Sequence, residues 1–409
     1  MVAYHYPPVM GSSGVHRTLQ FSRHLPRHGW QPTILTVQSR AYRQISLDQM
    51  ASIPPEVHVE RAFSLDASRH LSIGGYHPLL FALPDSWSSW FLDAVRRGSK
   101  LIRRNRPDVI WSTFPIPTAH LIGATLQQQS DIPWVADFRD SMTEDDYPVP
   151  RMRWKAYRWI ERISVRRCVR AVFTTPGTCR MYAQRYPEIP ETRWVVIPNG
   201  YDEEDFDEAE RSVAKPRSAG NPLVLVHSGL LYPSERDPRS FFAALARLLD
   251  TGEITPGSVK IVLRAAGYKP VHQEHIRQHR LEKVVHLEPP LPYREALKEM
   301  LLADGLLVFQ ASNCNHQVPA KVYEYLRCRR PILALTDPVG DTASVLREAG
   351  VDSIVRLDSV EEIVQFLPRF LASCRAGTAP LPSVDFIRDC SRAEGARRLA
   401  SILDEIVEK

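Results

Sequence analysis

Short apolar segments that alternate with longer amphipathic segments constrain the fold of this 409-residue chain more than any other feature. Ten such segments are rich in Val, Ile and Leu and mostly lack polar alternation. They are residues 33–37, 108–112, 134–137, 171–175, 194–197, 223–226, 260–263, 284–287, 306–309 and 332–335. Strands that are apolar on both faces are typical of parallel sheets covered by helices on each side. The pattern predicts an α/β fold of two successive domains, each with a parallel sheet.

A change in composition marks the domain boundary. Residues 197–200 read Ile-Pro-Asn-Gly and end a strand, and they are followed by acidic residues 202–210 and by Pro- and Gly-containing residues 215–222. Sequence of this kind is typical of a linker. The predicted parts are an N-terminal domain over 1–200, a linker over 201–222, a C-terminal domain over 223–385, and a C-terminal helix over 386–409 that can pack back on the N-terminal domain.

Composition and charge narrow the functional classes. No apolar run approaches the ~18 residues of a membrane span, and we see no signal peptide, so we expect a cytoplasmic protein. The six cysteines form no Cys-x-x-Cys pair, and an Asp-x-Asp motif at Asp205 and Asp207 lies in the acidic linker, so we predict no metal site and no cofactor. The net charge of +5 divides into +9 for residues 1–197 (25 basic, 16 acidic) and −4 for the remainder.

A small-residue loop is the first candidate ligand site. Gly11, Ser12 and Gly14 follow a short β-like run and precede a predicted helix. Such a turn allows close approach of a ligand and directs helix N–H groups toward an anion. An ordinary strand-to-helix turn explains the pattern equally well.

Two further candidates lie in the C-terminal half. Pro319, Lys321 and Glu324 begin a predicted helix between two strands, where Lys321 suits a diphosphate and Glu324 suits sugar hydroxyls; a surface ion pair is the alternative. Gly229 follows the first strand of this half, and Arg236 precedes the next helix, where its guanidinium can bind phosphate. A solvated loop arginine is the alternative there.

Taken together, these motifs resemble those of the GT-B glycosyltransferases, and in particular of glycosyltransferase family 4. The resemblance rests on the glycine loop, residues 30–36, Asp-Phe-Arg-Asp at 137–140, Ile-Pro-Asn-Gly at 197–200, and residues 319–326 with 330–333. The Asp-Phe-Arg-Asp motif resembles a polysaccharide-associated "DFRD" branch. The resemblance implies two Rossmann-like domains with parallel sheets that face each other across a cleft.

The family resemblance also implies an activity and assigns roles. It implies retaining, metal-independent transfer from a nucleotide-diphospho-sugar to a glycan or lipid-diphosphate acceptor, in bacterial cell-surface polysaccharide biosynthesis. Glu324 would bind the donor ribose, Arg236 and Gly229 the diphosphate, and Gly11 and Gly14 the sugar and acceptor. Two positions depart from the family pattern: His316 stands where many relatives carry an acid, and Leu230 where they often carry Arg. Lys321 is our substitute cation.

Two features of the N-terminal half bear on the acceptor. Asp140 ends a segment that leaves a strand and can orient or deprotonate the acceptor hydroxyl; a structural pair between Arg139 and Asp140 is the alternative. Residues 151–170 hold eight basic residues against one acid, Glu161, with Trp and Tyr among them. This composition suits peripheral attachment to an anionic inner-membrane surface, and a solvated basic face is the alternative.

Two other functional classes remain open. A sugar-nucleotide epimerase would share the nucleotide site but would need additional acid/base carboxylates, which we do not identify. A non-catalytic protein that binds nucleic acid through the basic helix would show steeply salt-dependent affinity. We find no nucleic-acid-binding motif, and the positive charge is confined to parts of one domain, so we expect no nucleic-acid partner.

Overall fold

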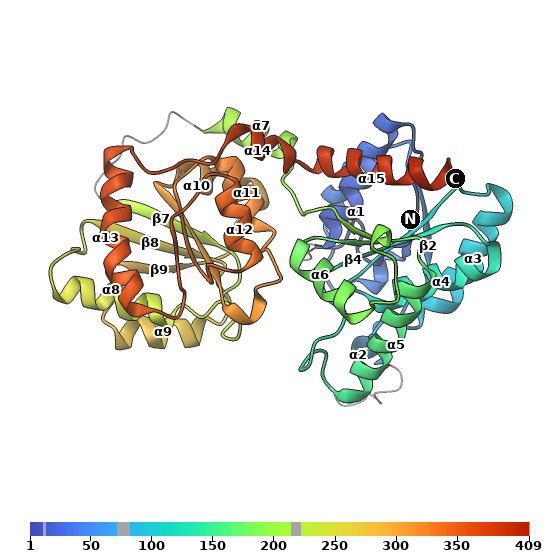
Figure 1. Cartoon of the computed structure of the whole chain (residues 1–409), viewed down its shortest axis with the longest axis horizontal. Coiled ribbons are helices and arrows are strands. Elements are labelled where there is room, and N and C mark those ends of the chain that lie inside the picture. Colours follow the sequence, from blue (N-terminus) through green and yellow to red (C-terminus); the bar gives the residue numbers. More distant parts are fainter. Residues whose placement is uncertain (11–13, 72–81, 214–221, 409) are drawn as a thin grey trace. The chain divides into compact units, whose positions relative to one another are not determined.

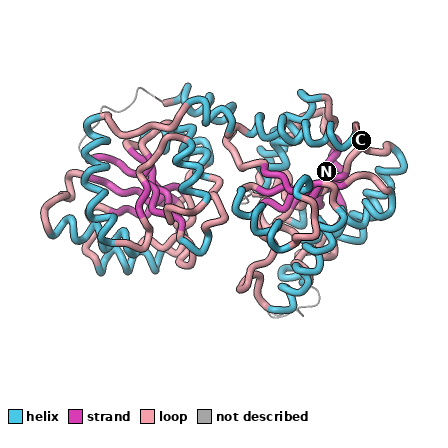
Figure 2. Tube along the Cα trace, in the orientation of Figure 1, coloured by secondary structure: helices cyan, strands magenta, loops and turns pink. Residues whose placement is uncertain are grey.

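The computed structural model describes residues 1–10, 14–71, 82–213 and 222–408 (Figures 1 and 2). These residues form two compact units: the first unit contains Met1–Pro198 and Arg392–Lys409, and the second contains Asn199–Ser391. Each unit has its own parallel sheet and its own helices. None of the helices in the described ranges is both long enough and apolar enough to span a bilayer.

The sheet of the first unit is parallel throughout. Val2 bridges to Leu35 on one side and to Ser112 on the other, so the first residues of the chain lie between β1 and β3. Along the sheet the strands follow the order β2, β1, the Val2 segment, β3, β4, β5 and β6. The strands are β1 (Thr33–Val37), β2 (His58–Ala62), β3 (Ile110–Thr113), β4 (Trp134–Arg139), β5 (Arg170–Phe173) and β6 (Trp194–Val196).

Helices cover both faces of this sheet. The core on one face contains Trp90, Trp134 and Phe138. The core on the other face contains Phe21 and Trp111 together with residues of the C-terminal helix α15. The C-terminal helix packs on α1 through Ala396, Leu399 and Leu403. The helices of this unit are α1 (Gly14–His24), α2 (Ala67–His70), α3 (Trp90–Arg104), α4 (Pro117–Ser130), α5 (Arg151–Arg167), α6 (Pro176–Arg185) and α15 (Arg392–Val407).

The second unit has a six-stranded parallel sheet in the order β12, β11, β10, β7, β8, β9. Its strands are β7 (Leu223–Ser228), β8 (Val259–Arg264), β9 (Val285–Glu288), β10 (Gly305–Gln310), β11 (Ile332–Thr336) and β12 (Ile354–Val355). Its helices are α7 (Glu203–Ser212), α8 (Arg239–Asp250), α9 (Lys269–Gln278), α10 (Tyr293–Leu302), α11 (Lys321–Cys328), α12 (Asp341–Glu348), α13 (Val360–Ala376) and α14 (Val384–Asp389).

Both faces of this second sheet are buried, which explains why its strands read as unbroken apolar runs. Leu225 and Leu307 face a core formed with α8, α9 and α13, whereas the adjacent residues Val226 and Val308 face a core formed with α7, α10, α11 and α12. Alternate residues of a strand point to opposite faces, so a strand between two helical layers must be apolar at every position. The expectation of parallel-sheet α/β architecture is confirmed.

Two expectations about the boundary are corrected by the structure. Residues 203–212, placed in a linker, form α7, and Phe206 of this helix is fully buried in the second unit. Asp202 caps the helix by accepting a hydrogen bond from the Glu204 amide, and Asp205 and Asp207 lie on it. The range 386–409 is also divided, because the chain passes from α14 in the second unit to α15 in the first unit near Ser391.

Candidate functional site

Two of the predicted donor residues, Gly229 and Lys321, lie in segments that follow strands at the carboxyl edge of the second sheet. The chain leaves β7 toward β8 on one side, whereas β10 pairs with β7 on the other side, so the order of strands reverses between β7 and β10. Ligands of parallel α/β sheets bind beyond the strand ends at such a point. Gly229 follows β7, Gln310 ends β10, and Lys321 begins α11 after β10.

Gly229 gives the backbone a conformation that other residues adopt poorly. Its φ of +144° lies in the region that L side chains rarely enter, and the nearest atom to a Cβ added at this position would be Nε2 of His227, at 3.9 Å. Its amide donates to the carbonyl of Arg264 on β8, which fixes the loop. The space beside Gly229 is therefore open to a ligand that approaches the backbone closely.

Arg236 is positioned above the end of β10 by neutral groups. Its Nε donates to Oε1 of Gln310 at 3.4 Å, one Nη donates to the Leu230 carbonyl at 3.3 Å, and its guanidinium lies 5.5 Å from the ring centre of Tyr232. Among the described residues no carboxylate forms an ion pair with it, so its charge is available to an anionic ligand. Its own backbone amide donates to the Tyr232 carbonyl, which closes the turn before α8.

Lys321 and Glu324 are joined on one face of α11. Nζ of Lys321 lies 2.5 Å from Oε2 of Glu324, and the Tyr293 hydroxyl donates to Oε1 of Glu324 at 3.1 Å. Glu324 is 6% exposed, whereas Lys321 is partly exposed. Pro319 was expected at the first helical position, but α11 begins at Lys321, and the Pro319 carbonyl instead accepts from the Val322 amide in the preceding turn.

His227 is a further buried residue at this edge, and the sequence did not single it out. Its Nδ1 lies 2.9 Å from the Leu307 carbonyl, while its Nε2 is buried without a hydrogen-bond partner among the described residues. Burial lowers the pKa of His227 to about 4, and the charges of Arg236 and Lys321 both contribute to this lowering. A neutral ring that donates from Nδ1 presents Nε2 as an acceptor. The place of His227 two residues before Gly229 was the available signal.

In the first unit, the predicted glycine loop is only partly described. Gly11 and Ser12 lie outside the described residues, and Gly14 is the buried first residue of α1. The same helix carries Arg17, which donates from two nitrogens to the two carboxylate oxygens of Asp137, each at 2.9 Å. Both side chains are almost fully buried, so the first acid of the Asp-Phe-Arg-Asp motif holds a structural arginine that sequence reasoning did not identify.

The last two residues of that motif do not form the structural pair that was the alternative. Asp140 is exposed and accepts a long hydrogen bond, 3.4 Å, from the Thr174 hydroxyl. Arg139 has a φ of +61° at a bulge between β4 and β5, and no ion pair joins it to a carboxylate in the described part of the chain. Asp140 is thus placed at the carboxyl edge of the first sheet with its carboxylate in solvent.

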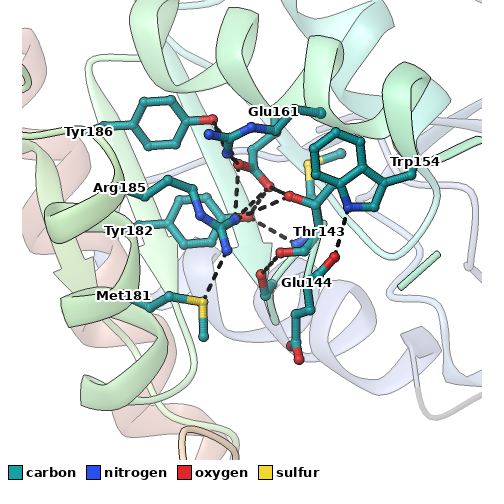
Figure 3. Close-up of polar contacts among 11 residues, drawn as sticks. Thr143, Glu144, Trp154, Glu161, Met181, Tyr182, Arg185 and Tyr186 are labelled. Carbon is teal, nitrogen blue, oxygen red and sulfur yellow. Dashed lines mark hydrogen bonds and ion pairs between the residues drawn. The ribbon is translucent and has the colours of Figure 1, made fainter. Parts of the chain in front are cut away.

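The basic helix α5 is anchored to the first unit by its single acid. Glu161 is fully buried and accepts hydrogen bonds from Tyr182 at 2.9 Å, Tyr186 at 2.7 Å and Arg185 at 3.0 Å, all on or beside α6 (Figure 3). Thr143 and Arg158 complete the cluster. Arg158, one of the eight basic residues of this segment, is therefore turned toward Glu161.

The outward face of α5 combines positive charge with large apolar side chains. Met152 is 56% exposed and Trp159 is 50% exposed, so two large apolar side chains of this helix point to solvent. The exposed basic residues of the helix are Arg151, Lys155, Arg162, Arg166 and Arg167. Exposed Trp beside basic residues is unusual for a merely solvated helix face.

Part of the chain matches a known protein family. The family model described as "Glycosyltransferase Family 4" matches residues 14–205. No curated protein matches the chain by sequence. The matched region covers most of the first unit and the start of α7, and it includes the Asp-Phe-Arg-Asp motif.

Solved structures match both units. A trehalose 6-phosphate synthase from Burkholderia multivorans has a TM-score of 0.69 at 11% identity and covers 100% of this chain and 96% of its own. A glycosyltransferase from Rickettsia africae gives 0.66 at 12% identity, covering 100% and 99%. Anabaena HepE, solved with UDP-glucose, gives 0.62 at 14% identity, covering 99% of each chain. A UDP-N-acetylglucosamine 2-epimerase shares the fold as well. Identities this low establish the fold and nothing finer.

Proposed function

Since the model of Glycosyltransferase Family 4 matches residues 14–205 and the whole chain has the GT-B fold, we propose that it is a metal-independent, retaining glycosyltransferase. It transfers a hexosyl group from a nucleotide-diphospho-sugar to a hydroxyl of a glycan or lipid-linked acceptor. The observation that carries the proposal is the position of Gly229 and Arg236 after β7, and of Lys321 and Glu324 on α11 after β10, at the edge where the strand order reverses.

The donor is held at the carboxyl edge of the second sheet. The backbone at Gly229 admits the diphosphate, Arg236 and Lys321 neutralise it, and Glu324 accepts hydrogen bonds from the ribose hydroxyls. A carboxylate accepts about four hydrogen bonds, so ribose hydroxyls can join the donors Tyr293 and Lys321 around Glu324. HepE was solved with UDP-glucose, a donor of this class.

Departure of the nucleoside diphosphate is the chemical step that these groups assist. The bond between the anomeric carbon and the diphosphate oxygen breaks, and negative charge develops on that oxygen. Fixed cations aimed at the developing charge lower the barrier without reorganisation. Asp140 is the residue of the first unit proposed to orient or deprotonate the acceptor hydroxyl, and its carboxylate is exposed at the strand ends where an acceptor can reach it.

The donor assignment is tested by binding and hydrolysis without metal. Nucleotide sugars are screened by thermal shift in the presence of EDTA, and the best binder is assayed for release of nucleoside diphosphate. Glu324→Ala should lower turnover by a large factor in a folded protein, whereas Arg239→Ala, which alters an exposed arginine paired with Asp237, should not. Full activity in Glu324→Ala would remove the donor site assigned here.

The structural likeness to an epimerase makes one alternative worth testing in the same assay. An epimerase would return an epimerised sugar with or without nucleotide release and would not extend an acceptor. A transferase releases nucleoside diphosphate in proportion to the lengthened glycan. Product analysis by mass spectrometry and NMR separates the two activities.

We further propose that α5 attaches the enzyme to the anionic inner face of a bacterial membrane, where a lipid-diphosphate acceptor for polysaccharide biosynthesis would lie. Trp159 and Met152 would enter the interface while Lys155 and Arg162 contact lipid headgroups. Each basic residue near such a surface contributes about 1 kcal/mol. Trp159→Ala with Met152→Ala should abolish sedimentation with vesicles rich in phosphatidylglycerol at low salt, and Leu92→Ala, at an even more exposed apolar residue on α3, should not.

A further inference from the structure

Arg139 is a buried arginine that forms no ion pair with an acid in the described part of the chain. Its exposed fraction is 9%, yet its Nε has no hydrogen-bond acceptor there, and its guanidinium makes a long hydrogen bond of 3.5 Å from Nη1 to the Phe114 carbonyl. A buried guanidinium is normally paired with a carboxylate, because an unpaired buried charge costs several kcal/mol. Arg17 in the same unit shows the normal arrangement with Asp137.

The backbone of Arg139 is also held in an unfavourable conformation. Its φ of +61° is left-handed, which costs a non-glycine residue about 1–3 kcal/mol. The conformation is fixed from outside, because the Arg139 carbonyl accepts from both the amide and the hydroxyl of Thr174, at 3.0 and 2.9 Å. Arg139 thus combines an unpaired buried guanidinium with a left-handed backbone. Such unfavourable features cluster at functional sites, where the surrounding structure holds them in place.

The position of Arg139 is that of a ligand site. It ends β4 at the carboxyl edge of the first sheet, and its guanidinium reaches the end of β3 at Phe114. The strand order of this sheet reverses where the Val2 segment meets β3, and His5 follows that segment. His5 has a pKa lowered to about 4 by burial, with a smaller contribution from the charge of Arg139.

The neighbouring carboxylates do not pair with the Arg139 guanidinium within the described part of the chain. Asp137 is already bound by Arg17 and by the Thr113 hydroxyl. Asp140 is exposed, and no ion pair between it and Arg139 is present among the described residues. Burial lowers the pKa of Arg139, and the charges of Asp140 and Asp137 only partly offset that effect. The guanidinium is thus fixed, desolvated and short of an acceptor on the side of Nε.

We propose that Arg139 is an oxyanion-binding residue of the first unit, which receives a phosphate or carboxylate group at its guanidinium. A guanidinium binds both groups in the same two-pronged geometry. This assignment rests on the proposed function, which places the acceptor on the first unit. The oxyanion is then a group of the acceptor, such as a sugar phosphate or a uronic acid. The residues involved are different from the donor cations of the second unit.

Hydrogen–deuterium exchange of the full chain tests this proposal, with inorganic phosphate as the probe and chloride at equal ionic strength as the reference. Phosphate at twice its dissociation constant should slow exchange about threefold in peptides that span 110–117 and 137–143. Arg139→Gln should remove this protection, and Arg103→Gln, which alters an exposed arginine on α3, should retain it. Acetate in place of phosphate distinguishes a carboxylate site from a phosphate-selective one.

The same exchange experiment also tests the donor site, through peptides of the second unit. Protection near residues 227–239 alone would overturn the Arg139 proposal and leave the donor site intact, whereas protection near 137–143 alone would leave Arg139 in place and count against the donor site. A structural role for Arg139 is excluded by melting temperature: Arg139→Gln should melt at or above the wild-type temperature, since it removes an unpaired buried charge. A fall of more than about 5 °C would overturn the proposal.

Discussion

Basic side chains at the carboxyl edges of the two sheets differ in their exposure and in the partners that neutralise them. In the second unit, Arg236 is held by neutral oxygens and Lys321 is one-third exposed at its side chain, so both cations stay hydrated in the free protein. In the first unit, Arg17 is neutralised in a buried pair with Asp137, while Arg139 is buried without one among the described residues. The second unit also has a paired arginine, since Arg264 at the end of β8 binds Glu299. We propose that such paired arginines serve architecture and that Arg236, Lys321 and Arg139 serve ligand binding.

The largest expected effect is the loss of the buried pair in the first unit. Asp137→Ala leaves Arg17 charged and about 5% exposed without its carboxylate, which should lower the free energy of unfolding by about 3–5 kcal/mol. Chemical denaturation measures this loss. Lys321→Met in the second unit leaves the buried Glu324 with the Tyr293 hydroxyl as a donor, so its cost should be smaller than that of Asp137→Ala.

The double variant Asp137→Leu with Arg17→Met is the control for this first prediction. It removes both charges together and should recover most of the lost stability, because no unpaired charge remains. Equal losses in the double variant and in Asp137→Ala would show that the pair does not account for the stability, and would weaken the contrast between the two edges.

The second prediction concerns catalysis at the edge of the second unit. Arg236→Ala removes a cation from the proposed leaving group and should lower turnover of the nucleotide sugar about 100-fold or more, equivalent to about 3 kcal/mol. The melting temperature should change little, since Arg236 forms no ion pair among the described residues. Arg17→Met, by contrast, should lower stability with no comparable loss in kcat of the protein that remains folded.

The third prediction uses His227 as a reporter of the second edge. Its folded pKa of about 4 lies below the ordinary value of 6.5, so the unfolded chain binds the proton more readily between these pH values. The stability that neutral His227 contributes is therefore complete above pH 6.5 and is lost as the pH falls toward 4. The stability of the wild type relative to His227→Asn should fall by about 2 kcal/mol between roughly pH 6.5 and 4.5.

His5 serves as the matched reporter at the first edge, because its pKa is also lowered to about 4. Burial is the main cause of both lowered pKa values; the charge of Arg139 adds to it at His5, whereas the charges of Arg236 and Lys321 add to it at His227. Arg139→Gln should raise the pKa of His5 and leave that of His227 unchanged, as read from histidine ring resonances by NMR. A shift of both resonances would contradict two separate clusters of charge.

The sequence predicted the framework of both units well, and the reason is local. The ten apolar runs correspond to β1 and to β3 through β11, because a strand covered on both faces has to be apolar. The missed strand β2 carries His58, Glu60 and Arg61 and lies at an edge of its sheet, where alternation with charge is tolerated; β12, also missed, is an edge strand of two residues. Helix α7 was missed because its acidic context concealed the buried Phe206.

The candidate site was predictable only where neighbours in sequence are neighbours in space. Lys321 and Glu324 could be paired from their spacing on a helix. The bond between Arg17 and Asp137 spans 120 residues, and the left-handed backbone of Arg139 depends on Thr174 after the next strand. Neither has a signature in a single sequence, since both result from the alignment of strands that tertiary packing alone determines.

The smallest expected effect separates backbone strain from ligand binding at Gly229. Gly229→Ala places a Cβ at φ +144° and should cost about 1 kcal/mol of stability, while the methyl group occupies the space proposed for the diphosphate. Gly350→Ala is the matched control: its φ is +82°, no atom lies within 4 Å of the added Cβ, and it follows α12 away from the site. Both variants should lose similar stability, as measured by denaturation. Only Gly229→Ala should raise the KM for the nucleotide sugar, by about tenfold. An unchanged KM in Gly229→Ala would mean that the diphosphate does not approach this backbone. The open space beside Gly229 would then not be a donor site, and the proposed contrast between the two sheet edges would fail.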